Sequence, residues 1–141
     1  MSQFSIVLAL FFAAIVSGCG NQKSPVAPAK GQVFYQGKAL GFGSVMFQPT
    51  AGPPARGAIQ PDGTFELSTY GNHDGAIVGQ HKVRIACVES QRGLNGPRTK
   101  PGDATGGDKP LIPLKYSHFV SSGLSVEVKE HNDPFIWELV D

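Results

Sequence analysis

Cys19 is the residue whose sequence neighbours most clearly specify a chemical reaction. It follows Val16, Ser17 and Gly18, which close an uncharged apolar run that starts at Ile6. The thiolate of a cysteine is a strong nucleophile and can be acylated or alkylated. The small side chains of Ser17 and Gly18 leave room for a peptidase to reach the peptide bond before Cys19. The pattern therefore predicts cleavage before Cys19 and covalent modification of its thiol.

The four residues Val16 to Cys19, with the apolar run before them, resemble the lipobox of bacterial lipoprotein signal peptides. The run is shorter than the about 20 apolar residues of a membrane-spanning helix and matches the about 7–15 of a signal peptide. The resemblance implies a signal peptide over 1–18 and a lipid with fatty acyl chains such as palmitate on Cys19. It also implies a cell-envelope location outside the cytoplasm. Met1 to Ser5 hold no Lys or Arg, which departs from the usual signal peptide. The alternatives are an ordinary secretory signal or an apolar strand of the fold.

His73 and Asp74 are the next candidates for chemistry, because they lie together in the Gly-rich segment 71–75. With Asp62, Asp103 or Asp108 nearby they could ligate a cation. A metal site needs three or four convergent ligands, and no local spacing here supplies them. The alternative is a turn in which Asn72 and Asp74 serve the backbone conformation. We therefore expect no metal site and no cofactor other than the lipid on Cys19.

Catalytic residues are not evident in the sequence. Cys87 and His81 fall on one face of a predicted strand, but six strand residues separate two side chains by about 20 Å. A buried packing role for Cys87 is the better interpretation. Ser121 and Ser122 have no nucleophile elbow around them, and His118 and His131 complete no triad order. We expect a protein that is not an enzyme, with a hydrolase as the least favoured class.

Aromatic side chains near loops could contact a ligand. Tyr70 and Tyr116 lie beside predicted loops, whereas Tyr35 and Trp137 fall on predicted inward faces. The candidate contact residues are therefore Tyr70, His73, Asp74 and Tyr116, with core or loop packing as the alternative for the two tyrosines.

The elements that carry these residues follow a period of two from Gly31 onward, which is typical of half-buried strands. About seven short strands are predicted, the longest and most central over 80–89. A hairpin turn is predicted at Tyr35 to Lys38, and another turn at Pro61 to Gly63. The alternation predicts an antiparallel β-sandwich over 31–141, after a tether over 19–30. Because residues at about 90–110 lack periodicity, we expect a long flexible loop there, either functional or disordered.

Composition narrows the class of partner. The formal net charge is +1, with 12 Lys and Arg against 11 Asp and Glu. A nucleic-acid-binding domain should show a basic stripe, so no nucleic-acid partner is expected. If Cys19 carries lipid, Cys87 is the one other cysteine and no disulfide forms within the chain, so stability must come from packing.

Several segments resemble the carboxypeptidase regulatory-like, transthyretin-like β-sandwich domain found in small bacterial lipoproteins. They cover nearly all of 31–141 and are mostly turns and core positions, namely 31–40, 43–47, 61–65, 78–83, 112–116, 122–126 and 135–139. The chain departs from the family pattern at Leu114, where an acidic residue is common, and at His131, where a glycine is common. The resemblance implies a non-catalytic module with no active site to carry over.

These observations together predict a lipid-anchored, extracytoplasmic module with a structural or binding role at the cell envelope. Its expected partners are the membrane, through the lipid, and an envelope protein or a polysaccharide. The alternative is a carbohydrate- or cation-binding module. Contacts are expected on the loops at 70–75 and 90–110, because rigid sandwiches commonly bind through loops.

Overall fold

The structure of this chain is a computed structural model that describes residues 20, 22–89 and 109–141. The predicted signal residues Val16, Ser17 and Gly18, the lipidation residue Cys19 and most of the predicted loop at 90–110 lie outside these residues.

The described chain is built of strands, which confirms the predicted all-β class. The elements are β1 (Val26–Ala27), β2 (Lys30–Tyr35), β3 (Lys38–Ala39), β4 (Ser44–Pro49), β5 (Ala55–Ala58), β6 (Thr64–Glu66), β7 (Ala76–Ile77), β8 (Gly79–Ala86), the 3-10 turn η2 (Leu114–Ser117), β9 (Leu124–Val128) and β10 (Phe135–Leu139). Seven of these strands have three or more residues, which agrees with the prediction of about seven strands. None of the described residues form a helix that could cross a membrane.

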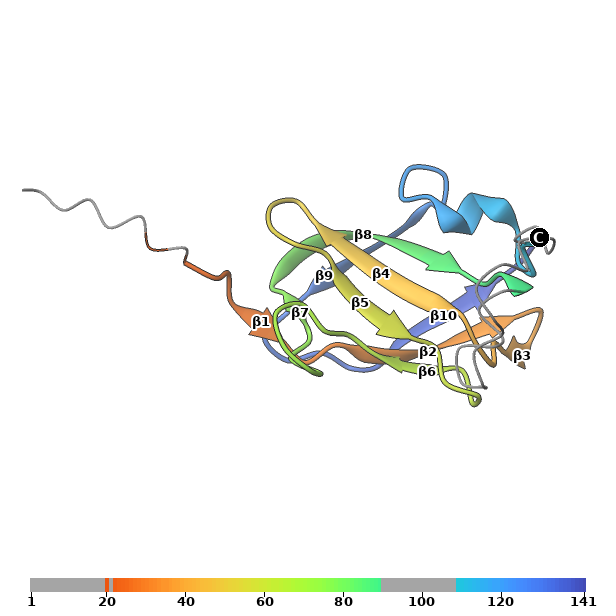
Figure 1. The fold of residues 1–141 in the computed structure, drawn as a ribbon, viewed down its shortest axis with the longest axis horizontal. Helices are drawn as coiled ribbons and strands as arrows, with labels where there is room; N and C mark the ends of the chain where they lie inside the picture. Colours follow the sequence, from red (N-terminus) through yellow and green to blue (C-terminus); the bar gives the residue numbers. More distant parts are fainter. Residues whose placement is uncertain (1–19, 21, 90–108) are drawn as a thin grey trace, which may run out of the picture.

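Two four-stranded sheets face each other (Figure 1). One has the order β5-β4-β8-β9 and is antiparallel throughout. In the other, β2 pairs with β10 on one side and with β3 and β6 on the opposite side. β8 is the longest strand and lies inside its sheet, as predicted. A third, two-stranded sheet joins β1 to β7.

Phe47 on β4 is the centre of the core between the two sheets. Its ring lies 6.4 Å from that of Phe65 on β6 and 5.5 Å from that of Phe135 on β10, both edge to face. Such aromatic contacts add to the free energy of burying the rings. Alternate residues of the strands are buried, namely Val45, Phe47, Phe65, Leu67, His81, Val83, Ile85 and Leu139. Tyr35 and Trp137, both predicted on inward faces, are half-buried and pack against this core.

The predicted hairpin turn at Tyr35 to Lys38 is also confirmed. Tyr35 pairs with Lys38 across two residues with positive φ, Gln36 at 50° and Gly37 at 77°. This is the backbone of a type I′ turn, whose twist matches that of the strands it joins.

One strand pair departs from the antiparallel expectation. β10 runs parallel to β2, with Trp137 beside Val33. The alternation of side chains gives each strand its inward face but carries no information about strand direction. β10 follows β9, which belongs to the opposite sheet, so no hairpin with β2 sets its direction.

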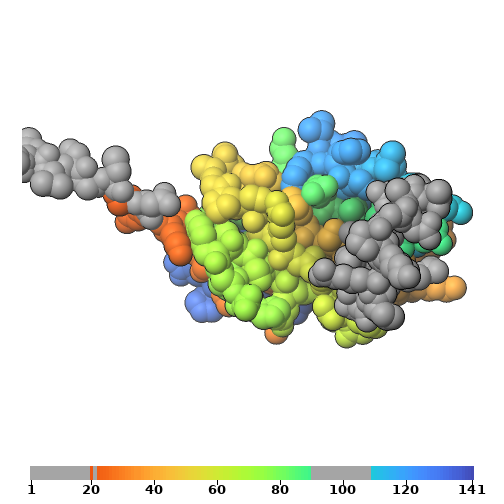
Figure 2. Space-filling model, in the orientation of Figure 1, coloured from red at the N-terminus to blue at the C-terminus, as the bar shows by residue number. Residues whose placement is uncertain are grey.

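The packed body also begins earlier than predicted. Within the segment expected to be a tether, 19–30, β1 pairs with β7, and Ala27 and Ala29 are buried in the core. Their small side chains fit into the core. Two alanines in the sequence are too weak a pattern to predict a strand there. The residues that lead into β1 lie at one end of the body (Figures 1 and 2), and the C-terminus lies at the other (Figure 1).

Candidate functional site

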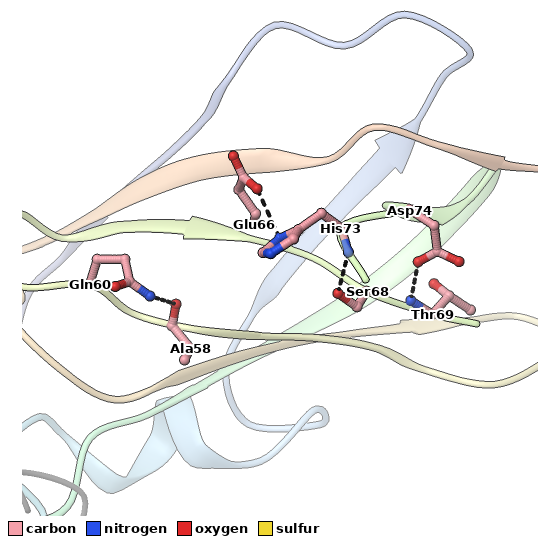
Figure 3. A network of polar contacts seen from close by, with 7 residues as sticks. All are labelled: Ala58, Gln60, Glu66, Ser68, Thr69, His73 and Asp74. Atoms are coloured by element: carbon pink, nitrogen blue, oxygen red, sulfur yellow. Dashed lines mark hydrogen bonds and ion pairs between the residues drawn. The ribbon is translucent and has the colours of Figure 1, made fainter. Parts of the chain in front are cut away.

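Asp74 organises the loop between β6 and β7. Its Oδ1 accepts a hydrogen bond from the N–H of Thr69 at 2.7 Å, and its Oδ2 accepts from the N–H groups of Tyr70 and Gly71, each at 2.9 Å. Figure 3 shows the carboxylate turned toward Thr69. Both oxygens are thus engaged by the loop's own backbone, so Asp74 serves the turn, the structural alternative considered from the sequence.

These hydrogen bonds also set the acidity of Asp74. Partial burial raises the pKa of the carboxyl group, but the bonds from Thr69, Tyr70 and Gly71 favour its charged form and outweigh that effect. The net result is a pKa below the ordinary value. The loop is therefore most firmly held when Asp74 is ionised.

His73 is held in an unusual backbone conformation by the same loop. Its φ is 55°, a region that residues other than glycine seldom adopt. Its N–H donates to Ser68 Oγ at 2.9 Å, and its ring Nδ1 lies 2.9 Å from Glu66 Oε2 on β6 (Figure 3). Because a carboxylate can only accept, Nδ1 carries the hydrogen in this contact. The ring is thereby turned toward β6.

A polar groove of about 500 Å³ lies beside this histidine. We call it the β5–β6 groove. It is lined by Arg56, Gly57, Ala58, Gln60, Thr64, Phe65, Glu66, Ser68 and His73. Its volume falls within the range of small-ligand sites.

The groove exists because β5 and β6, edge strands of opposite sheets, are joined only at the two ends of their contact. Arg56 and Ser68 exchange two backbone hydrogen bonds at one end, and the N–H of Gln60 donates to the carbonyl of Thr64 at the other. Between these points Gly57 passes so close to β6 that a Cβ on it would lie 2.4 Å from the Glu66 carbonyl oxygen. A side chain at Gly57 would therefore push the strands apart.

Tyr70 contacts a different part of the chain from the part that His73 contacts. Its hydroxyl oxygen accepts the N–H of Ser24 at 3.1 Å, and Lys23 Nζ lies 5.3 Å from the centre of its ring. The tyrosine is 36% exposed. It therefore contacts the segment that leads into β1, beside the loop that carries His73 and Asp74.

Tyr116 is not an exposed contact residue, which corrects the expectation from sequence. It is only 6% exposed, and its hydroxyl donates to the Val140 carbonyl and accepts from the Val140 N–H. The reason is that η2 folds back onto the body next to β8 and buries Ile112 and Tyr116 while leaving Leu114 outside. Of the predicted contact residues, Tyr70, His73 and Asp74 thus lie together in one loop, whereas Tyr116 lies apart from them in the core.

The candidate catalytic pair is part of the core. Cys87 and His81 are both buried, and His81 Nε2 lies 2.6 Å from the Ile77 carbonyl oxygen, so that nitrogen carries the hydrogen. His81 Nδ1 and Trp137 Nε1 are buried with no hydrogen-bond partner among the described residues. The packing role inferred for this face of β8 agrees with the burial of both side chains.

The described residues contain no group of three or more His, Cys, Asp or Glu side chains that could hold a metal ion. Asp62, one of the acidic residues considered as a ligand, instead accepts from the Thr64 N–H and hydroxyl across its own turn. Asp103 and Asp108 lie outside the described residues.

Of the residues that line the groove, only His73 was predicted from the sequence as a contact residue; Arg56, Gln60 and Glu66 are among those that were not. The alternation of 64–68 does place Thr64, Glu66 and Ser68 on the outward face of one strand. Nothing in the local pattern shows that β5 lies beside β6, because these strands belong to different sheets and meet only at a corner of the fold. No family profile, curated protein sequence or solved structure matches this chain.

Proposed function

We propose that this chain is a lipid-anchored module of the bacterial cell envelope, with a body that binds a partner outside the cytoplasm and does not catalyse a reaction. The observation that carries the proposal is the segment Val16 to Cys19 after an uncharged apolar run. The resemblance of residues 31–141 to the carboxypeptidase regulatory-like domain supports the same role.

The fold is compatible with a short anchor. Val26, the first residue of β1, is the seventh residue after Cys19, so the body can lie at most about 25 Å from a lipid on that residue. Two or three acyl chains on one cysteine would hold the protein firmly, because each buried CH₂ contributes about 0.8 kcal/mol. In this arrangement the β1 end of the body is nearest the membrane.

A binding role is supported by the β5–β6 groove and the loop beside it. The groove presents cationic, anionic and neutral polar side chains on a rigid pair of sheets, as small-ligand sites commonly do. Of the two alternatives considered from the sequence, the groove favours a carbohydrate-like polar ligand over a cation. Asp74 uses both its oxygens to hold the loop backbone, and the described residues around it contain no group of three or more side chains that could hold a metal ion.

The anchor is tested by the mass of the mature protein extracted from membranes. We expect an N-terminal Cys19 that carries a diacylglycerol group, and loss of this mass and of membrane attachment in Cys19→Ala. Cys87→Ala is the matched control, because Cys87 is buried in the body and should leave lipidation unchanged. An unmodified Cys19, or an intact Met1, would contradict the proposed anchor.

A further inference from the structure

We infer that the β5–β6 groove binds an acidic saccharide through Arg56, with the carboxylate of a uronic acid on the guanidinium group and the sugar hydroxyls on the neighbouring polar side chains. This inference rests on the proposed binding role of the body but does not depend on the lipid.

Charge in the groove comes from Glu66 and Arg56. The Glu66 carboxylate accepts a hydrogen bond from Nδ1 of His73 at 2.9 Å, in a pair whose side chains are 55% and 69% exposed. Arg56 is exposed on β5, and its guanidinium takes part in none of the hydrogen bonds or ion pairs found among the described residues. Among the described residues it is therefore a cation without an ionic partner. A planar guanidinium binds a carboxylate through two parallel hydrogen bonds.

The uncharged polar side chains of the groove offer both hydrogen-bond donors and acceptors. Ser68 Oγ accepts the N–H of His73 and keeps its own hydrogen to donate. The Thr64 hydroxyl donates to Asp62 at 2.6 Å and so presents its lone pairs. Nε2 of Gln60 donates a long hydrogen bond of 3.5 Å to the Ala58 carbonyl oxygen. The amide group keeps a second hydrogen to donate and an oxygen that can accept. Sugar hydroxyls donate and accept at once, and a lining of this kind can match both.

Nucleic acid and peptide fit the groove less well than an acidic sugar. Nucleic acid would require many unpaired cations, whereas the net charge of the chain is +1. A peptide that docks through an apolar side chain or as an added strand would need an apolar pocket or a free strand edge, but Phe65 is 1% exposed and both ends of the β5–β6 contact are already joined by backbone hydrogen bonds. An acidic sugar needs neither.

The experiment is a calorimetric titration of the full chain, extracted in detergent, with digalacturonic acid and with the neutral disaccharide galactobiose. We expect the acidic disaccharide to bind and the neutral one to bind at least about tenfold more weakly, because it lacks the charge-assisted hydrogen bonds to Arg56. In parallel, amide resonances of residues 56–58 and 64–68 should shift.

Three variants make the test specific. Arg56→Gln should weaken binding of digalacturonic acid about tenfold or more, and Arg56→Lys by a smaller factor, because lysine keeps the charge and loses the planar fork. Lys82→Gln is the matched control: it removes one exposed positive charge from β8, in the opposite sheet, and should change affinity by less than about twofold. Arg56 is exposed, so thermal unfolding should show that all variants fold.

Several results would overturn the inference. One is unchanged affinity of Arg56→Gln for digalacturonic acid. Another is the absence of binding up to millimolar concentrations of that disaccharide. Acetate or inorganic phosphate binding as tightly as digalacturonic acid would mean that the hydroxyls contribute nothing, and the saccharide assignment would be wrong. None of these results affects the mass of the N-terminus, so failure of this inference and failure of the proposed anchor are distinguishable.

Discussion

A single carboxylate, that of Asp74, holds the backbone of the loop that shapes one side of the groove. Three N–H groups donate hydrogen bonds to it, and the preceding residue, His73, adopts a positive φ in the same turn. A conformation of this kind persists only where neighbouring contacts enforce it. The position of the His73 ring therefore depends on a side chain that does not itself line the groove.

Replacing Asp74 with Ala should destabilise the protein by about 1–2 kcal/mol at neutral pH, because three hydrogen bonds to a charged acceptor are lost at a partly exposed site. Urea unfolding measures the difference. Asp74→Asn keeps one acceptor oxygen and should recover part of the loss.

The pH dependence of that difference follows from the lowered pKa of Asp74. A depressed pKa in the folded state means that the stabilisation is fully present above the ordinary value of about 4, and is lost as the pH falls through the lower folded value. The gap between the wild-type protein and Asp74→Ala should therefore shrink below about pH 4. A gap that stays constant to acid pH would contradict the role assigned to the charged form.

At the scale of the element, the loop between β6 and β7 joins the groove to the segment before β1. Tyr70 contacts Lys23 and Ser24, while His73, three residues later, contacts Glu66 on the groove. A shift of the segment before β1 would therefore also move the loop that carries His73.

Tyr70→Phe tests this contact. It removes the hydroxyl that accepts the Ser24 N–H and keeps the ring, so we expect amide exchange at Ser24 to become several-fold faster, with global stability changed by about 1 kcal/mol or less. Hydrogen exchange followed by NMR is the measurement. Tyr35→Phe is the matched control, since it removes a hydroxyl bonded to Asp141 and should leave Ser24 unchanged. Equal exchange at Ser24 in Tyr70→Phe and the wild-type protein would show that the contact does not hold the segment.

The strands themselves could be predicted from the sequence, and the reason is local. Alternation at Val45 and Phe47, or at Phe65 and Leu67, reports which face of a strand is buried, and the turn residues report where each strand ends. The groove could not be predicted in the same way. It depends on β5 and β6 meeting at a corner between sheets, and no short stretch of sequence encodes that contact.

Tyr116 shows a second limit of the sequence. Its place beside a loop favoured exposure, yet η2 turns it inward, where its hydroxyl closes two hydrogen bonds with Val140. A tyrosine can satisfy its polar end at the backbone of a distant strand, so its neighbours in sequence do not decide its burial.

At the scale of the whole molecule, both sheets share one core. Replacing Phe47 tests whether the two sheets unfold together. The ring contacts Phe65 and Phe135 of the opposite sheet, and it is fully buried. Phe47→Ala should cost about 3–5 kcal/mol and lower the stability of both sheets in a single unfolding transition. Urea unfolding followed by tryptophan fluorescence and by circular dichroism measures it, since Trp137 reports on one sheet.

Ile136→Ala is the matched control for this prediction. Ile136 lies on β10 next to Phe135, but it is 58% exposed, so its loss should cost less than about 1 kcal/mol. Two separate transitions in Phe47→Ala, reported at different urea concentrations by the two probes, would mean that the sheets do not share one core.

The parallel pair of β2 and β10 has a consequence for when this protein can fold. It joins segments far apart in the chain, as does the hydrogen bond between Tyr35 and Asp141, 106 positions apart. Contacts of such long range form slowly, and during synthesis they must wait for the later partner to be made. β2 can pair early with β3 and β6, but it lacks β10 until the last strand has left the ribosome. For the extracytoplasmic protein that we propose, this delay would suit a chain that is threaded through a translocation channel before it folds.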